Sequence, residues 1–456
     1  MILDSLTVLE DLVRFPSVSA DSAYKQGLSD TRDYLESQLQ KIGFDVEVIK
    51  TPGHPIILAE RLVTPKAPKV VIYGHYDVQP PDPIDLWKSA PFEPEVRGDR
   101  IYGRGAADNK GPVSVYLGAL SELLDENPNI ALNIVLLLEG EEEIGSPSFV
   151  PALKAYADRI KGDFVFACDT GSLRQDQLSV TTGLRGISCI QVNLEGASQD
   201  FHSGLYGGAI LNPIHALADI CHSLHNDDGT INVPGFYDGI DDIEDWERDE
   251  LLRAGDDLDT LKVFLGVNEF YTAPGLNASE APRLAPTLEF NGIGGGYQGE
   301  GSKTVIPSKA FVKISCRLVA NQVGDNIQQL VMKAIEERCP EQMRLSFDVE
   351  HNGNPYLVVP PGKPNTPIDI NPVLAKAFRS NEFHGEALFG NKPVYLREGG
   401  SIPIIGDIKQ ILGMDTLLVG LYLPEDGMHA PNESFSLTMM SRGKTLIKKI
   451  LSDLPK

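Results

Sequence analysis

Several acidic and histidine side chains of this sequence stand just beyond apolar runs, where they could bind divalent cations. The apolar runs "KVVIYG", "IVLLL" and "FVFAC" are each followed by such residues. The candidate residues are His75, Asp77, Asp108, the glutamate cluster within residues 139–143, Asp169 and His429. Nitrogen and carboxylate-oxygen ligands of this mix suit Zn²⁺, Mn²⁺ or Co²⁺. Taken singly, each residue also has a structural explanation, as a hydrogen-bonded strand end, a helix N-cap or a turn residue, so the hypothesis requires that the fold brings them together.

The spacing of two motifs indicates different tasks for neighbouring residues. His75 and Asp77 are two positions apart, so they point the same way from an extended chain, and Asp77 can orient the imidazole of His75. Adjacent glutamates on a turn diverge, so one can bind a metal ion while the other takes a proton from a water that the metal has made more acidic. The stretch "LLLEGEEEIGS", residues 136–146, therefore predicts both a ligand and a general base.

The elements that must position these residues are of two kinds. Residues 1–185 alternate helices with continuous Val/Ile/Leu strands, which is typical of a mostly parallel sheet with helices on both faces. In residues 186–366, strands of alternating polarity accompany two helices, which predicts an inserted α+β domain, and residues 367–456 return to the first pattern. We therefore predict an α/β catalytic domain in two segments. In such a sheet the carboxyl ends of the strands form the ligand crevice.

Composition argues against several other functions. At 456 residues the chain is too long for a single core. A net charge of −24 disfavours binding to nucleic acid or to anionic membranes. No run reaches the roughly 18 apolar residues of a membrane span, and "MILDSLTVLEDLVRF" reads as an amphipathic helix rather than a signal peptide. The five scattered cysteines contain no C-x-x-C pair, which indicates a reducing compartment, and we expect the cytoplasm.

A set of motifs extending from about residue 70 to 435 resembles the M20 (aminoacylase/carboxypeptidase) metallopeptidases, and most closely their dipeptidase branch, which includes the carnosinase-like cytosolic dipeptidases. The motifs are "YGHYDVQP", "WKSAPFEPEVRGDRIYGRGAADNKGP", "LLLEGEEEIGSPS", "FHSGLYGG", "KTVIP", "REGGSIP" and "GMHAPNE". The resemblance implies a homodimeric enzyme that hydrolyses the peptide bond of dipeptides or short peptides. It also implies two divalent metal ions per subunit, either Zn²⁺ or Mn²⁺, with Co²⁺ as a further candidate.

The resemblance implies a ligand set for these two ions. His75 and Asp169 would bind one ion, Glu143 and His429 would bind the other, and Asp108 would bridge the two. The peptide bond after Asp108 would be cis.

The resemblance also implies the residues that carry out proton transfer. Asp77 would orient His75, and Glu142 would be the general base. Relatives typically show a pair of glutamates before "x-G-S", which selects Glu142 and Glu143 and leaves open whether Glu141 shares the role of Glu142.

Substrate residues follow from the same resemblance, in the inserted domain and in "REGGSIP". That domain would be a lid and dimerisation domain, in which His202 reaches the site of a partner subunit and polarises the scissile carbonyl. Arg317 would bind the terminal carboxylate of the substrate, for which a planar guanidinium is suited. Glu398 would receive a free α-amino group, and Ser401 and Thr304 would contact substrate.

Two alternative functions stay open. One is an N-acyl amino acid hydrolase or carboxypeptidase on the same scaffold, and the other is a non-catalytic peptide-binding relative. Glu398, together with "DVQP" and "REGGSIP", favours a substrate with a free amine, and therefore a dipeptidase. The ligand and base positions are all filled, which argues against a relative that has lost its chemistry.

Overall fold

In a computed structural model, which describes residues 2–255 and 257–455, the chain forms two compact units. The first unit contains the chain up to Thr182, then Val358–Leu396 and the chain from Asp407 onward, and the second contains Gly183–Leu357 and Arg397–Gly406. Residues 397–406 were expected in the second catalytic segment, but they belong to the second unit. A physical reason is that Arg397 forms a two-pronged ion pair with Glu247 of that unit, with Nε 2.6 Å from Oε1.

The first unit is built on a mixed sheet with the strand order β1-β2-β6-β3-β7-β17-β8. Its strands are β1 (Asp45–Ile49), β2 (Ile56–Arg61), β3 (Lys69–His75), β6 (Asn133–Glu139), β7 (Phe164–Gly171), β8 (Ser179–Leu184) and β17 (Thr416–Tyr422). The central pairs β6–β3, β3–β7 and β7–β17 are parallel, and the outer pairs are antiparallel. A further strand, β16 (Val394–Glu398), pairs with β8. The prediction of a mostly parallel catalytic sheet is confirmed.

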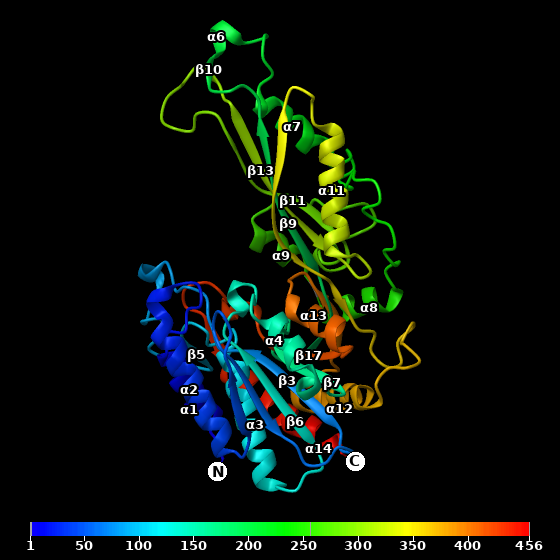
Figure 1. Ribbon diagram of the computed structural model, residues 1–456. Coiled ribbons are helices and arrows are strands. Elements are labelled where there is room, and N and C mark those ends of the chain that lie inside the picture. The colour runs from blue at the N-terminus through cyan, green and yellow to red at the C-terminus, as the bar shows by residue number, and fades with distance from the viewer. Residues whose placement is uncertain (1, 256, 456) are drawn as a thin grey trace. The chain divides into compact units, whose positions relative to one another are not determined.

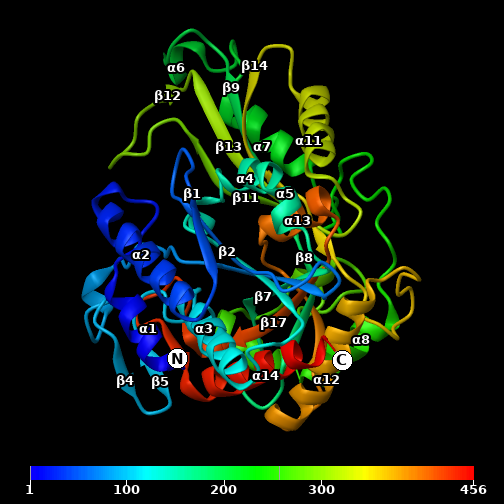
Figure 2. The same ribbon diagram turned by 60° about the horizontal axis from the view of Figure 1, so that its bottom comes forward.

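Helices cover both faces of this sheet, as Figures 1 and 2 show. The helices of this unit are α1 (Ser5–Arg14), α2 (Lys25–Lys41), α3 (Lys110–Glu126), α4 (Phe149–Ala155), α5 (Ala157–Ile160), α12 (Pro372–Phe389), α13 (Pro403–Leu412, whose first residues belong to the second unit) and α14 (Leu437–Asp453). The ring of Tyr73 packs edge-on against Phe149 of α4, and Phe166 packs against Tyr116 of α3. Because Phe166 pairs in register with Ile72, the neighbour of Tyr73, the two ring pairs lie on opposite faces.

The second unit has an antiparallel four-stranded sheet with the order β11-β13-β9-β14. Its strands are β9 (Gly186–Glu195), β11 (Thr287–Gly295), β13 (Lys309–Leu318) and β14 (Arg344–Gly353). In β9 buried residues alternate with partly exposed ones, and the buried face packs on α7 (Pro213–Ser223) and α11 (Gly324–Arg338) (Figure 1). Short strands β10 (Phe201–His202) and β12 (Val305–Ile306) form a separate ribbon. The inserted α+β fold is confirmed.

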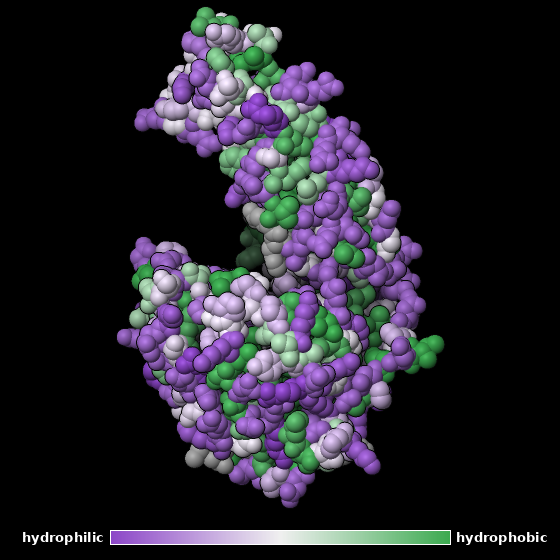
Figure 3. All heavy atoms as spheres, viewed as in Figure 1, coloured by the Kyte–Doolittle hydropathy of each residue, from purple (hydrophilic) through white to green (hydrophobic). Residues whose placement is uncertain are grey.

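The helices bear on the expectation that the sequence contains no membrane span. Over residues 2–255 and 257–455 the helices are all too short or too polar to cross a membrane. Hydrophilic residues dominate the face drawn in Figure 3. In α8 (Asp245–Ala254), which lies in an acid-rich stretch, Glu247 and Glu250 are buried and pair with arginines.

Candidate metal centre

The carboxyl ends of neighbouring parallel strands bring the candidate residues to one edge of the first unit's sheet. β3 ends at His75, and β6 ends at Glu139, just before the glutamate run. β7 carries Asp169 near its end, and β17 ends at Tyr422, a few residues before His429. These four strands are adjacent, since their order in the sheet is β6-β3-β7-β17. The convergence therefore follows from the parallel topology.

The structure collects the predicted ligands into two groups that share Asp108. The groups are His75, Asp108 and Asp169, and Asp108, Glu143 and His429, and within each group the ligand atoms lie within 4.8 Å of one another. Asp108 faces each group with a different oxygen. Its Oδ1 is 3.0 Å from His75 Nε2, and its Oδ2 is 3.0 Å from His429 Nε2. This is the arrangement that a bridging carboxylate requires.

The donor set fits divalent cations. Oε1 of Glu143 is buried without a hydrogen-bond partner, which is costly unless a ligand fills that position. The remaining donors are imidazole nitrogens and carboxylate oxygens, which suit zinc, manganese and cobalt. His429 has a half-exposed side chain, at 55%, whereas the side chains of His75 and Glu143 are buried. A cation here would therefore be held in a largely buried site that is open on the His429 side.

The charges of these residues depend on each other. Burial opposes the charged form of His75, but its hydrogen bonds to Asp108, Asp169 and Asp77 outweigh this and raise its pKa. Hydrogen bonds to Asp108 and Glu143 raise the pKa of His429 to about 10. The neighbouring carboxylates thus favour the positive charge on both imidazoles, and bound dications would compensate the same negative charges.

Asp77 contacts both halves of the site. Its Oδ1 lies 3.4 Å from His75 Nδ1, which also lies 3.2 Å from the backbone carbonyl oxygen of Asp77. The same carboxylate accepts the backbone N–H groups of Glu142 and Glu143, at 3.2 and 3.1 Å. Asp77 therefore also sets the conformation of the glutamate turn, a role that the H-x-D spacing did not reveal.

The three consecutive acids 141–143 have different environments. Glu141 is buried, and its Oε1 and Oε2 accept the backbone N–H groups of His54 at 2.7 Å and Ser148 at 3.0 Å. A Cβ on Gly53 would lie 1.6 Å from Glu141 Oε1, so the loop needs glycine there. The carboxylate of Glu141 thus ties two loops together, whereas Glu142 lies near His75, Asp169 and Asp108.

Three residues beside the ligands were not singled out from the sequence. Gln79 Nε2 donates to Glu143 Oε2 at 2.9 Å. Asn109 Nδ2 and Tyr422 Oη donate to Asp169 Oδ1, at 2.7 and 2.6 Å. Gln79 and Tyr422 stand just beyond or at strand ends, as the ligands do, and this position is the signal that could have found them. The peptide bond between Asp108 and Asn109 is cis, as expected.

Glu433 is another residue that the sequence analysis missed. It is fully buried, and its Oε1 accepts the N–H groups of Ala107 at 2.9 Å and Asp108 at 3.0 Å. Its Oε2 accepts the N–H of Gly105 at 2.9 Å and Arg104 Nη1 at 2.5 Å. Glu433 therefore holds the loop that carries Asp108, the residue shared by the two ligand groups.

The predicted substrate residues all lie in the second unit, in two places. Arg317, near the end of β13, donates from Nη1 to Ser401 Oγ at 2.8 Å, and Glu398 belongs to the same short segment as Ser401. His202 pairs with Val305 in the β10–β12 ribbon, where Ser203 N donates to the carbonyl of Thr304 at 3.0 Å. The ribbon leads into the start of β13, so the two places lie at opposite ends of that strand (Figure 1).

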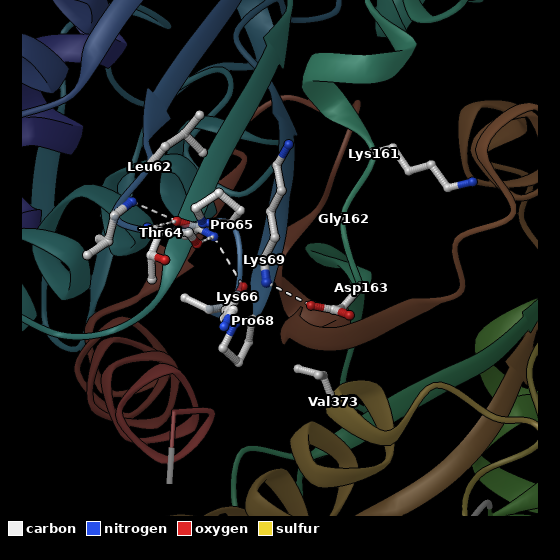
Figure 4. Close-up of a pocket in the computed structure, with 13 residues that line it drawn as sticks. Leu62, Thr64, Pro65, Lys66, Pro68, Lys69, Lys161, Gly162, Asp163 and Val373 are labelled. Carbon is white, nitrogen blue, oxygen red and sulfur yellow. Dashed lines mark hydrogen bonds between the residues drawn. The ribbon is translucent and has the colours of Figure 1, made fainter.

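A cavity of about 650 Å³ in the first unit lies away from the residues of the candidate metal centre. Its wall includes Lys69 and Asn133, which begin β3 and β6, so it lies at the opposite edge of the sheet from the candidate metal centre. Figure 4 shows that the side chains of Lys69 and Lys161 point in different directions. The backbone N–H of Lys69 donates to Asp163 at 2.7 Å. The cavity has no convergent set of polar groups that would indicate chemistry.

A mostly parallel sheet with two candidate ligand groups around one shared carboxylate is typical of metal-dependent hydrolases. The model of peptidase family M20/M25/M40 matches residues 71–453. The chain belongs to this family and is an M20-type enzyme.

Three similar proteins indicate the branch. Cys-Gly metallodipeptidase of Schizosaccharomyces pombe is 30% identical, over 98% of this chain and 95% of that protein. Human Beta-Ala-His dipeptidase is 28% identical, over 94% of this chain and 82% of that protein. The crystal structure of an M20 family metallo-carboxypeptidase from Sulfolobus solfataricus matches with a TM-score of 0.86 and 29% identity, over 100% of both chains. The predicted resemblance to the dipeptidase branch is confirmed.

Proposed function

We propose that the chain is a metal-dependent dipeptidase that hydrolyses dipeptides or similarly short peptides with a glutamate general base. The observation that carries the proposal is the pair of ligand groups that share Asp108 and lie beside Glu142. The metallodipeptidases among the relatives support it. Two divalent cations per subunit, each zinc, manganese or cobalt, are consistent with the ligands.

The five ligand residues would hold these cations in the proposed centre. His75 and Asp169 would hold one, Glu143 and His429 the other, and Asp108 both. When bound, the cations polarise a carbonyl group and make water more acidic. Asp77 keeps His75 and the glutamate turn in place through its contacts to both.

Glu142 is the proton carrier in this proposal. Burial raises its pKa, and the charges of Asp169, Asp108 and Glu143 raise it further. A carboxylate with a raised pKa is a stronger base, so a carboxylate oxygen of Glu142 takes a proton from the attacking water. The same oxygen then gives this proton to the leaving amine nitrogen, which breaks the peptide bond and restores the carboxylate.

A Glu142→Gln variant tests this assignment. The amide cannot accept a proton, so the variant should keep the metal content of the native protein and lose nearly all turnover of a dipeptide such as Ala-Gly. Metal content is measured by elemental analysis on the same sample. Glu141→Gln is the matched control, because its carboxylate bonds to backbone N–H groups, and it should change stability more than turnover. Undiminished activity of Glu142→Gln would remove this residue from the mechanism.

Chelation tests the metal requirement separately. The chelated protein should lose activity, and adding back Zn²⁺, Mn²⁺ or Co²⁺ one at a time should restore it and identify the most effective ion. Activity that survives complete metal removal would contradict the proposed centre.

We propose that the substrate is oriented by residues of the second unit. Arg317 would bind the terminal carboxylate, since its guanidinium, which already donates to Ser401, is suited to a carboxylate. Ser401 itself would contact the substrate, and Glu398 would receive the free α-amino group. Thr304 would contact substrate beside His202.

We propose a homodimer, and the spacing of these residues supports it. Lys309 and Arg317 are eight residues apart on β13, a distance of about 27 Å at the rise of an extended strand. An extended dipeptide spans only about 7 Å. His202, at the far end of the strand, therefore cannot reach a substrate bound at Arg317 of the same chain. We propose that it polarises the scissile carbonyl in the site of a partner subunit.

Co-expression of two inactive variants tests this exchange. The Glu142→Gln subunit keeps an intact His202, and the His202→Ala subunit keeps an intact Glu142. In each mixed dimer the site of the His202→Ala subunit is therefore complete, and the other site is not. With random pairing about a quarter of native activity should return. If the mixture stays as inactive as each variant alone, His202 does not act across a dimer.

A carboxypeptidase or N-acyl amino acid hydrolase is the second candidate. The likeness to a metallo-carboxypeptidase structure, with a TM-score of 0.86, favours it. Comparing dipeptides with their N-acetylated forms separates the two, because Glu398 can pair only with a free amine. Cleavage of the acetylated compounds alone would overturn the dipeptidase assignment.

We propose a cytoplasmic location. The cysteines at 168, 221 and 316 are buried thiols outside any disulfide. A reducing compartment keeps such thiols unpaired. Fractionation of cells with an antibody against the protein would test it.

A further inference from the structure

Two arginines of the second unit hold the same short loop. The side chain of Arg185 donates from Nε to the carbonyl of Gly399 at 2.9 Å, and its backbone N–H donates to the carbonyl of Gly400 at 3.2 Å. Arg317 donates from Nη1 to Ser401 Oγ at 2.8 Å. The loop of residues 399–401 is therefore held at three consecutive positions. Arg185 has not been given a role above.

Space around this loop is restricted. Nη1 of Arg185 also lies 3.4 Å from the carbonyl oxygen of Ala285. A Cβ on Gly399 would lie 2.6 Å from the carbonyl oxygen of Pro282 and 3.4 Å from Arg185 Nη2. Glycine is therefore needed at 399 for the loop to approach this closely. The orientation of Ser401, and with it the position of the Arg317 guanidinium, depends on the contacts of Arg185.

The positive charge of the two guanidinium groups is only partly offset, for Arg185 by the charge of Glu289. Neither forms an ion pair with a carboxylate anywhere in residues 2–255 or 257–455. Both line one cavity of about 970 Å³ within the second unit, together with Thr287, Glu289 and Ser315. Burial and the charge of Arg317 together lower the pKa of Arg185 to about 10, against the opposing charge of Glu289. An anion bound between them would relieve this repulsion.

We propose that Arg185 is a positioning residue for carboxylate recognition, which fixes the 399–401 loop and adds its charge to that of Arg317. Substrates with a free terminal carboxylate would then be preferred over the corresponding amides. This inference rests on the proposed function, in which Arg317 binds that carboxylate. Arg185 acts through the loop and through Arg317, and Arg317 makes the direct contact.

The test compares an acid with its amide. Turnover of Ala-Leu and of its C-terminal amide is measured for the metal-loaded native protein and for Arg185→Met. The variant should raise KM for Ala-Leu about tenfold or more, as expected for loss of charge-assisted contacts, with kcat much less affected. KM for the amide should change little. Arg185→Lys keeps the charge but loses the planar guanidinium fork. Its KM for Ala-Leu should therefore lie between that of the native protein and that of Arg185→Met.

Arg338→Met is the matched control. Arg338 also lies in the second unit, is partly exposed, and donates to backbone carbonyls, those of Ser223 at 2.9 Å and Asn232 at 2.5 Å. Because it lies on α11, away from the loop, its loss should leave the acid-to-amide preference unchanged. Circular dichroism establishes that each variant is folded.

The outcomes separate this inference from the proposed function. If Arg185→Met loses as much turnover of the acid as of the amide, Arg185 only supports the fold. If the variant prefers the acid over the amide as strongly as the native protein does, Arg185 has no role in carboxylate recognition. If the native protein cleaves acetyl-leucine but no dipeptide, the dipeptidase assignment fails, and the same comparison is made with acetyl-leucine and its amide. Calorimetric binding of leucine and leucinamide to the metal-loaded protein measures the preference without turnover. A native preference for leucine that Arg185→Met retains would overturn the inference.

Discussion

Glu433→Gln is expected to destabilise the first unit strongly, although it changes only one atom of the side chain. Each carboxylate oxygen of Glu433 accepts two donors, namely Ala107 N and Asp108 N at Oε1, and Gly105 N and Arg104 Nη1 at Oε2. An amide in either orientation turns its NH₂ group toward two of these donors. In both orientations the buried Arg104 loses its charged partner, and if the NH₂ group replaces Oε2 it loses the acceptor as well.

The magnitude follows from the burial of both partners. The side chains of Arg104 and Glu433 are each 1% exposed, and breaking a buried ion pair by removing one charge costs about 3–5 kcal/mol. Burial raises the pKa of Glu433, but a carboxyl proton would meet only N–H donors. The measurement is therefore made at about pH 8, where the carboxylate form is favoured. We expect the free energy of unfolding, from urea titration followed by circular dichroism, to fall by about 3–5 kcal/mol.

Glu425→Gln controls for the chemistry of the substitution. Glu425 lies in the same segment, its side chain is 60% exposed, and its Oε1 is 3.5 Å from Arg100 Nη1. Loss of this ion pair should lower the free energy of unfolding by less than about 1 kcal/mol, as for other surface ion pairs. A Glu433→Gln protein within that range of the native stability would refute the argument that four buried donors require a carboxylate.

Two further predictions concern the neighbours of the candidate metal centre. Asp77→Asn should weaken metal binding about 10- to 100-fold in competition with a chelator, because the amide can no longer accept both N–H groups of the glutamate turn. Asp85→Asn, an exposed acid nearby in the sequence, should leave metal affinity unchanged, and equal effects of the two substitutions would contradict this role of Asp77. Burial and the charge of Asp77 raise the pKa of Glu139 from 4.5 to about 8. Between these two pH values the folded state keeps a proton that the unfolded state releases. The free energy of unfolding should therefore fall as the pH rises through this range. In the chelated protein, Glu139→Gln should flatten the pH dependence of the urea midpoint between about pH 5 and 8, and a slope equal to that of the native protein would argue against the raised pKa.

Much of the fold could be predicted because its central strands are continuous apolar runs. β3, β6, β7 and β17 are buried on both faces, which leaves little ambiguity about a parallel sheet covered by helices. The strand ends then indicate where polar side chains gather, and the two ligand groups around Asp108 lie at that edge. The unit boundary was less predictable, because residues 397–406 belong to the second unit through contacts such as Arg397 with Glu247.

The supporting residues of the site could not be predicted for a different reason. Glu433 stands in an ordinary polar loop, and its importance comes from four donors that lie more than 300 positions earlier in the chain. Local patterns do not encode such a contact. In the same way, the spacing of relatives favours Glu142 over Glu141, but only the structure shows that Glu141 accepts the N–H groups of His54 and Ser148.

The strand order has a consequence for how the protein is made. β7 and β8 are nearly consecutive in the chain, yet β17 lies between them in the sheet. A ribosome must therefore finish the whole inserted unit before residues 416–422 can fill that gap, and His429 emerges later still. The candidate metal centre is thus incomplete until synthesis is almost finished, and until then the gap leaves two unpaired strand edges exposed.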